Sequence, residues 1–140
     1  MDDVKPCGEI GSDDSTAMLD SLGGASRKIA ICIQNSSQYI FEGPQYYIAS
    51  GDEPRKPPPT RIETNKGFIW GLTSNKVGDP IRGVLVYKIK GERKVLAFLW
   101  KVTAYQNEYQ NSWAINVLDM FRDPTPDNII NTSFNLSSIS

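Results

Sequence analysis

The run VLAFLW at residues 95–100 constrains the fold more than any other part of the chain. Successive side chains of a β-strand point to opposite faces of the sheet, so this run would place apolar groups on both faces. The run GVLVY at residues 83–87 has nearly the same character. Because a simple two-sheet sandwich buries only one face of each sheet, we expect a helix, a partner chain or a lipid to cover the other face.

Short runs of β-branched and aromatic residues recur along most of the chain. Turn-forming clusters separate them, such as NSSQ at 35–38, the proline-rich stretch 51–60 and SNKVGDP at 74–80. Many short strands at this spacing predict an all-β sandwich or barrel, and no helical crossovers suggest a parallel α/β sheet. The expected strands are 27–34, 39–50, 60–64, 67–72, 83–89, 94–102 and 112–118.

The composition of the 140 residues narrows the function classes. The length predicts one domain that is large enough to be stable without a disulfide or a metal. The formal net charge of −1 argues against nucleic acid as a partner. There is no histidine, no phosphate-binding loop and no cysteine–histidine metal spacing, so we expect no enzyme, no metal and no cofactor. A disulfide between Cys7 and Cys32 is possible, but two free thiols are favoured.

The two ends of the chain have different patterns from its middle. Residues 1–12 are polar and predict a disordered tail. Residues 13–24 predict a helix of two to three turns, with an apolar face formed by Ala17, Met18, Leu19 and Leu22. This helix is either a marginal element packed on the sheet or an amphipathic membrane segment.

The expected organisation is therefore an N-terminal tail with a short amphipathic segment, a β-sandwich and a polar tail, over residues 1–25, 26–118 and 119–140. Residues 129–134 carry one weak strand pattern within the last part. No apolar run is long enough to span a bilayer as a helix, and the acidic N-terminus does not resemble a signal peptide. The sequons at Asn35, Asn131 and Asn135 matter only if the chain is exported.

The stretch VTAYQNEYQNSW at residues 102–113 sets aromatic residues among amides. Tyr105 and Tyr109 lack the aliphatic neighbours of the other aromatic residues. Exposed tyrosines suit a membrane interface, and they can also hold a quaternary ammonium such as choline by cation–π attraction. The composition by itself favours an aromatic-braced surface loop over a ligand platform.

The order of these pieces resembles the actinoporin family, the cytolysins of sea anemones. The similarity covers about residues 26–118 and rests on SRKIAICIQNSS, YYIASG, the proline-rich loop, GFIWG, RGVLVYKI, VLAFLWKV and YQNEYQNSWAINV. The resemblance implies a β-sandwich flanked by two helices, which would explain the two-sided apolarity of residues 95–100. It also implies a secreted monomer that binds phosphocholine head groups, preferably sphingomyelin. In the family an N-terminal helix then inserts, and several protomers form a cation-conducting pore in the target-cell membrane.

The resemblance suggests four head-group residues. Aligned on Asn111 and Trp113, Tyr109 matches a choline-cage tyrosine, and Trp113 matches the second tryptophan of a pair. Tyr105 belongs to the same aromatic loop. Arg82 occupies a site that is small and apolar in the family.

The chain also departs from the family pattern. Thr103, Glu108 and Ser112 stand where the family has a proline and two tryptophans. No tyrosine-bearing second helix is visible after residue 118, so the second flanking helix is expected to be missing.

The segment 13–22 would reach about 15 Å as a helix, roughly half the hydrocarbon core. These departures predict weakened pore formation. The alternative is a non-lytic lipid-, glycan- or protein-binding module on the same sandwich, and a cytosolic location stays open because no signal peptide is visible.

Overall fold

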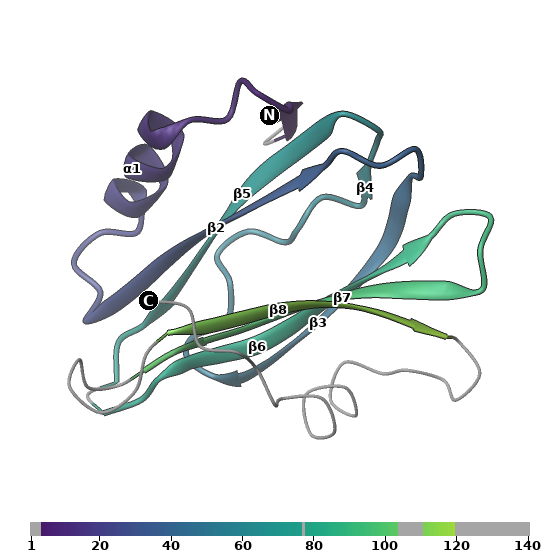
Figure 1. Cartoon of the computed structure of the whole chain (residues 1–140). Coiled ribbons are helices and arrows are strands. Elements are labelled where there is room, and N and C mark those ends of the chain that lie inside the picture. Colours follow the sequence, from purple (N-terminus) through teal and green to yellow (C-terminus); the bar gives the residue numbers. More distant parts are fainter. Residues whose placement is uncertain (1–3, 77, 104–110, 120–140) are drawn as a thin grey trace.

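The computed structural model describes residues 4–76, 78–103 and 111–119. Two antiparallel β-sheets pack face to face, and one helix lies on the outside of the smaller sheet (Figure 1). This arrangement confirms the expected all-β sandwich with a flanking short helix. No described helix is long and apolar enough to cross a membrane.

The smaller sheet has three strands in the order β1-β5-β2. These strands are β1 (Val4–Pro6), β5 (Lys66–Ser74) and β2 (Arg27–Asn35). Strand β5 is buried from Gly67 to Ser74 because the second sheet lies on one face and the helix on the other. It pairs with β2 along its whole length and with β1 at residues 66–68. Strand β2 is an edge of this sheet.

The larger sheet has five strands in the order β4-β3-β6-β7-β8. They are β4 (Arg61–Ile62), β3 (Phe41–Ser50), β6 (Ile81–Ile89), β7 (Lys94–Val102) and β8 (Ser112–Asp119). Strand β3 is irregular between Glu42 and Gln45, where Gly43 has a φ of 59° and Pro44 lacks an N–H donor. Strand β8 is the edge that lies on the same side of the molecule as β2 (Figure 1).

Aromatic rings fill the space between the sheets. Trp70 of β5 and Trp100 of β7 meet edge to face, with ring centroids 5.7 Å apart, and Tyr46 of β3 packs against Trp70 at 5.5 Å. Gly83 lies beneath Trp100, and a Cβ atom there would be 2.6 Å from the indole. The core therefore needs a glycine at this position, because any larger residue would displace the tryptophan.

Both faces of strands β6 and β7 are buried, as the runs at residues 83–87 and 95–100 predict. The outward-facing side chains form a second apolar cluster consisting of Val84, Val86, Val95, Ala97 and Leu99. Helix α1 (Ser12–Ser21) contacts β2 and β5 instead, on the outer face of the smaller sheet. This helix is therefore not the cover expected over residues 95–100.

Of the two predictions for the N-terminal residues, the helix is confirmed and the disordered tail is partly wrong. Helix α1 confirms the expected helix within residues 13–24, shortened at its C-terminal end. The expectation of a disordered tail is wrong for Val4–Pro6, which pair with β5 as a strand. The free edge of β5 supplies backbone partners there, and Val4 packs against the core. The predictions for residues 120–140 lie outside the described residues.

Candidate functional site

Helix α1 lies unusually close to the smaller sheet because Gly71 of β5 has no side chain. A Cβ atom at Gly71 would be 2.7 Å from the sulfur of Met18 and 3.0 Å from Leu22. Leu22 is buried, Met18 and Leu19 are half-buried, and Ala17 is exposed. Of the four residues predicted for the membrane-inserting face, the structure thus places Met18 and Leu22 directly on the sheet and leaves Ala17 in solvent.

Two cationic side chains hold the C-terminal end of α1. The Nζ atom of Lys28 donates hydrogen bonds to the carbonyl oxygens of Leu19 and Gly23, at 3.0 and 2.9 Å. Arg55 donates to the carbonyl oxygens of Ser21 and Leu22, both at 3.2 Å. The last carbonyls of a helix have no partner within the helix and carry partial negative charge, so both contacts are favourable. We refer to Lys28 and Arg55 as the cationic clamp.

A salt bridge holds the other end of the helix. The Nζ atom of Lys5 lies 2.6 Å from a carboxylate oxygen of Asp14, whose second oxygen accepts a hydrogen bond from the N–H of Gly11 at 2.9 Å. The hydrogen bond from Lys5 lowers the pKa of Asp14, and the same bond raises the pKa of Lys5. Strand β1 and helix α1 are therefore joined by a pair that water partly screens.

Two of the four predicted head-group residues, Arg82 and Trp113, lie within the described strands at one end of the larger sheet. Trp113 is opposite Trp100 on the inner face of β8, with 52% of its surface exposed. Arg82 is opposite Lys101, on the outer face of the same sheet. The structure thus brings Arg82 and Trp113 to the same end but not to the same face. Tyr105 and Tyr109, which the chain places between these positions, lie outside the described residues.

The base of the connection between β7 and β8 is tied to the rest of the fold. Arg27 donates through Nε to the carbonyl oxygen of Thr103 and through Nη1 to that of Asp79, both at 3.2 Å. The N–H of Thr103 donates to the side-chain oxygen of Asn111 at 3.2 Å. Arg27 therefore fixes the position from which the aromatic loop leaves the sheet. No sequence pattern predicts these roles for Arg27, Lys28 and Arg55, although the pair Arg27-Lys28 lies shortly after the helical segment.

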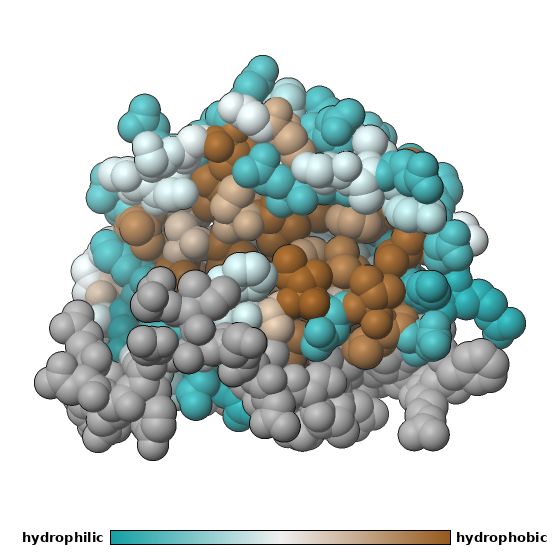
Figure 2. Space-filling model, viewed as in Figure 1, coloured by the Kyte–Doolittle hydropathy of each residue, from teal (hydrophilic) through white to brown (hydrophobic). Residues whose placement is uncertain are grey.

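The inner face of β8 carries a row of exposed apolar side chains. Trp113, Ile115 and Val117 are 52%, 52% and 57% exposed, and we call them the β8 stripe. Figure 2, drawn from the same side as Figure 1, shows hydrophobic residues gathered over the space between β2 and β8. The alternation of residues 112–118 predicts the strand, but the exposure follows from its place at the edge.

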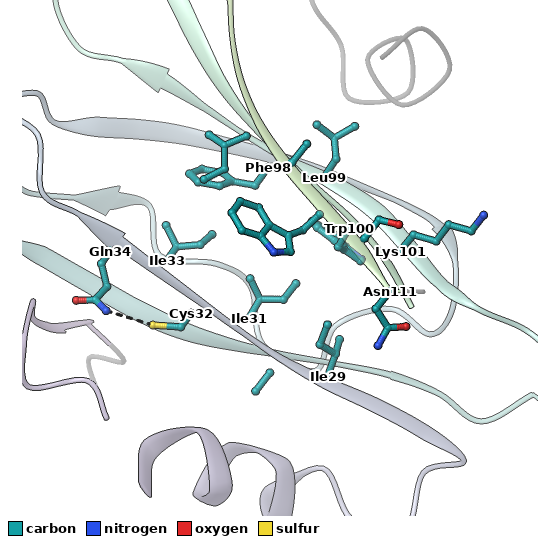
Figure 3. A pocket seen from close by; sticks show the side chains of 15 residues that line it. Ile29, Ile31, Cys32, Ile33, Gln34, Phe98, Leu99, Trp100, Lys101 and Asn111 are labelled. Atoms are coloured by element: carbon teal, nitrogen blue, oxygen red, sulfur yellow. Dashed lines mark hydrogen bonds between the residues drawn. The ribbon is translucent and has the colours of Figure 1, made fainter. Parts of the chain in front are cut away.

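Two hollows border the β8 stripe. The first has a volume of about 330 Å³ and lies between β2 and the adjacent ends of β7 and β8 (Figure 3). In this view Phe98 and Leu99 of β7 lie on one side of the hollow, and Ile29, Ile31 and Ile33 of β2 lie on the other. The second, of about 420 Å³, is lined by Phe41, Leu96 and Val117 together with polar residues.

Asn35 has a structural role. The side-chain nitrogen of Asn35, in the first sequon, donates to the carbonyl oxygens of Tyr39 and Ile62 at 2.7 and 3.2 Å. Cys7 and Cys32 are free thiols. Within residues 4–76, 78–103 and 111–119, no cluster of histidine, cysteine and carboxylate side chains could hold a metal ion.

Comparisons with known proteins connect this geometry to a family. A family model described as sea anemone cytotoxic protein matches residues 4–135. Bryoporin from Physcomitrium patens is 27% identical over 133 residues, which cover 94% of this chain and 74% of that protein.

Two further relatives are somewhat more similar over shorter alignments. DELTA-thalatoxin-Avl1b from Actineria villosa is 30% identical over 116 residues, which cover 80% of this chain and 50% of the toxin. Deep-sea actinoporin Cjtox I from Cribrinopsis japonica is 33% identical over 103 residues, covering 71% of this chain and 45% of that protein. The chain spans about half the length of these two relatives.

Proposed function

Because the chain belongs to the sea anemone cytotoxic protein family, we propose that it binds phosphocholine-bearing membranes and transfers helix α1 from its own sheet into the bilayer. The observation that carries this proposal is the docking of α1. No residue within Ser12–Ser21 is fully buried, and polar contacts at both ends hold the helix. When the helix leaves the sheet, the buried Leu22 and the half-buried Met18 and Leu19 lose their contacts, and insertion of these three side chains into lipid would replace them.

The lipid head group is the proposed ligand of the aromatic loop. Tyr105 and Tyr109 would hold the quaternary ammonium of phosphocholine, preferentially on sphingomyelin, with Trp113 and Arg82 on either side of the loop's base. Arg82 would face the phosphate. Glu108 disfavours anionic membranes, because their surface potential repels a carboxylate. Binding and insertion, and not an enzymatic reaction, are the proposed activity.

Pore formation is the proposed outcome after secretion and self-assembly on a target-cell membrane, and we expect it to be weak. Helix α1 has ten residues and would reach about 15 Å, about half the thickness of the hydrocarbon core. A cation-conducting pore lined by such short helices would need a thinned bilayer.

The short length of helix α1 favours a second candidate function. A helix too short to span the bilayer could still anchor the protein to its surface, so the chain could be a non-lytic module that binds lipid, glycan or protein. The sandwich fold does not distinguish these functions.

Vesicles test the proposal directly. Phosphatidylcholine vesicles with and without sphingomyelin would be mixed with the protein, and co-sedimentation and release of a trapped dye would be measured together. Binding with slow release supports weak pore formation, and binding without release supports the non-lytic lipid module. Absence of binding to both kinds of vesicle would exclude both membrane functions.

A matched pair of variants tests the head-group site. Tyr109→Ala should reduce vesicle binding without changing the unfolding midpoint, because it removes a proposed choline contact. Tyr47→Ala is the control, because Tyr47 is a 42%-exposed tyrosine on β3, outside the aromatic loop. Equal loss of binding in the two variants would contradict the assignment of Tyr109 to the head group.

A further inference from the structure

Strand β8 is incomplete in two respects. It is the last strand of the larger sheet, so one of its edges presents backbone N–H and C=O groups without a strand partner among the described residues. Its inner face carries the β8 stripe, whose three side chains are more than half exposed although they point to the core side of the sheet. Unpaired edges and exposed apolar rows are both features that folded proteins normally cover.

The inner face of β8 borders two hollows that the side chains of one more strand could fill. The hollow of about 330 Å³ lies at Trp113 and Ile115, and the hollow of about 420 Å³ lies at Val117. Together they follow the inner face of β8 along most of its length. An occupant must supply backbone hydrogen bonds along the edge and apolar side chains on one face only, which describes an amphipathic β-strand.

The chain itself contains such a segment after β8. In TSFNLSS at residues 132–138, Thr132, Phe134 and Leu136 alternate with Ser133, Asn135 and Ser137. This period-two pattern is typical of a half-buried strand. Phe134 and Leu136 are the apolar members of the pattern.

The length of chain after β8 allows this segment to return. Residues 120–131 can span roughly 40 Å, whereas a neighbouring strand lies only about 4.8 Å away. Pro124 and Pro126 within this connection disfavour regular structure and suit a loop. A strand from the same chain also has a smaller entropic cost of pairing than a separate molecule.

We propose that residues 132–138 add to the free edge of β8 as an antiparallel strand and close the open side of the sandwich. In the register that matches apolar side chains, Phe134 lies opposite Val117 and Leu136 lies opposite Ile115. Ser138 then lies opposite Trp113, which leaves the indole accessible next to the aromatic loop. Asn135 points to the opposite face of the sheet. This inference does not depend on the proposed membrane function.

Engineered disulfides test the pairing in the full-length chain. In a background with Cys7→Ser and Cys32→Ser, Ile115→Cys would be combined with either Leu136→Cys or Asn135→Cys, and Val117→Cys with Phe134→Cys. Directly opposed residues bring their Cβ atoms within disulfide distance, whereas Asn135 would lie on the other face. We expect the 115–136 and 117–134 pairs to form intramolecular disulfides at least tenfold faster than the 115–135 pair, as measured by mass spectrometry after mild oxidation.

The other outcomes contradict the proposal. Equal rates for the three pairs would show a tail without a fixed register. Disulfide-linked dimers as the main product would show that a second copy occupies the edge. Unfolding midpoints of the reduced variants establish that they are folded.

Hydrogen exchange on the unsubstituted chain gives an independent test. The amides of residues 132–138 should exchange at least tenfold more slowly than in a free peptide of the same sequence. Exchange at the peptide rate would overturn the proposal, even if the cysteine variants were poorly folded.

Discussion

Gly83 determines whether the central tryptophan of the sandwich can be accommodated. A methyl group there would lie 2.6 Å from both the Trp100 ring and the carbonyl oxygen of Tyr47. One neighbour is backbone and the other a large buried ring, so neither can move easily. The residue looks unremarkable in the run GVLVY, and its role follows from the pairing of Gly83 with Trp100.

The substitution Gly83→Ala should lower the free energy of unfolding by about 1–3 kcal/mol, because the core becomes overpacked. Denaturant unfolding followed by tryptophan fluorescence would measure this change. Gly24→Ala is the control, since a Cβ atom at Gly24 would contact nothing within 4 Å. A similar loss in both variants would contradict the argument from packing.

Tyr87 combines a buried ring with one satisfied polar group. Its hydroxyl donates to the carbonyl oxygen of Pro59 at 2.7 Å, and burial raises the pKa of the Tyr87 phenol far above its usual range. We expect Tyr87→Phe to destabilise the protein by about 1 kcal/mol, because the Pro59 carbonyl loses its donor. Calorimetry would show the shift, with Tyr47→Phe as an exposed control expected to be neutral.

The sequence named candidate head-group residues, but it could not show which face of the sheet each of them occupies. Trp113 and Arg82 were expected to serve one head-group site, and they do flank the same connection. Which face each occupies depends on strand register, and a shift of one residue moves a side chain to the other face. The resemblance gives an alignment and no register, so it could not have shown that these side chains point in opposite directions.

The docking of helix α1 depends on a few contacts of different kinds. Met18 and Leu22 contact the sheet at Gly71, the cationic clamp holds the last carbonyls, and Lys5 holds Asp14. A helix of ten residues is marginal in water by itself. The element is therefore helical because it is docked, and its stability is expected to be well below that of the sandwich.

Removing the cationic clamp should loosen the helix without unfolding the sheets. In Lys28→Gln with Arg55→Gln, the amides of α1 should exchange about tenfold faster, because two favourable contacts with the helix C-terminus are lost. Hydrogen exchange followed by mass spectrometry would resolve α1 from β5. Arg61→Gln is a control, since Arg61 is an exposed cation 3.6 Å from Glu63. A lowered global unfolding midpoint in the double variant would show that the clamp supports the whole fold instead.

Acid should also weaken the docking of helix α1. The pKa of Asp14 is lower in the folded chain than in the unfolded chain, so the stabilising contribution is present above the ordinary carboxyl range. It is lost as the pH falls through the lowered pKa of Asp14. An NMR titration of the α1 amides should show this transition, and Asp14→Asn should abolish it. Persistence of the transition in the variant would assign it to another group.

The architecture of the whole molecule was largely predictable from hydrophobic patterns. Alternation and turn clusters predicted the sandwich, and the two-sided apolarity of residues 95–100 predicted burial on both faces, which the structure confirms. Strand β1 was not predicted, because three residues are too few to carry a periodic signal. These residues form a strand because β5 offers them a free edge. The open side between β2 and β8 could not be predicted from the sequence either, because it depends on the relative widths of the two sheets.

The net charge of the whole molecule predicts how the proposed vesicle binding depends on salt. With a formal net charge of −1, we do not expect attraction to a charged surface to be the main source of the proposed membrane affinity. Binding to zwitterionic vesicles should change less than about twofold when the salt concentration is raised to about 0.5 M, where surface charges are strongly screened. Co-sedimentation at several salt concentrations measures this. A tenfold loss would instead indicate binding through a local cationic patch.

The burial of Asn35 has a consequence for biosynthesis. Only 1% of this residue is exposed, and the nitrogen that a glycan would modify donates both of its hydrogen bonds within the fold. In a compartment that carries out N-glycosylation, the modifying enzyme could reach this nitrogen only before the chain had folded. Folding and modification would then compete at Asn35, and a chain modified first could not complete the turn between β2 and β3. The rate at which this turn forms would therefore set the yield of native protein in a secretory host.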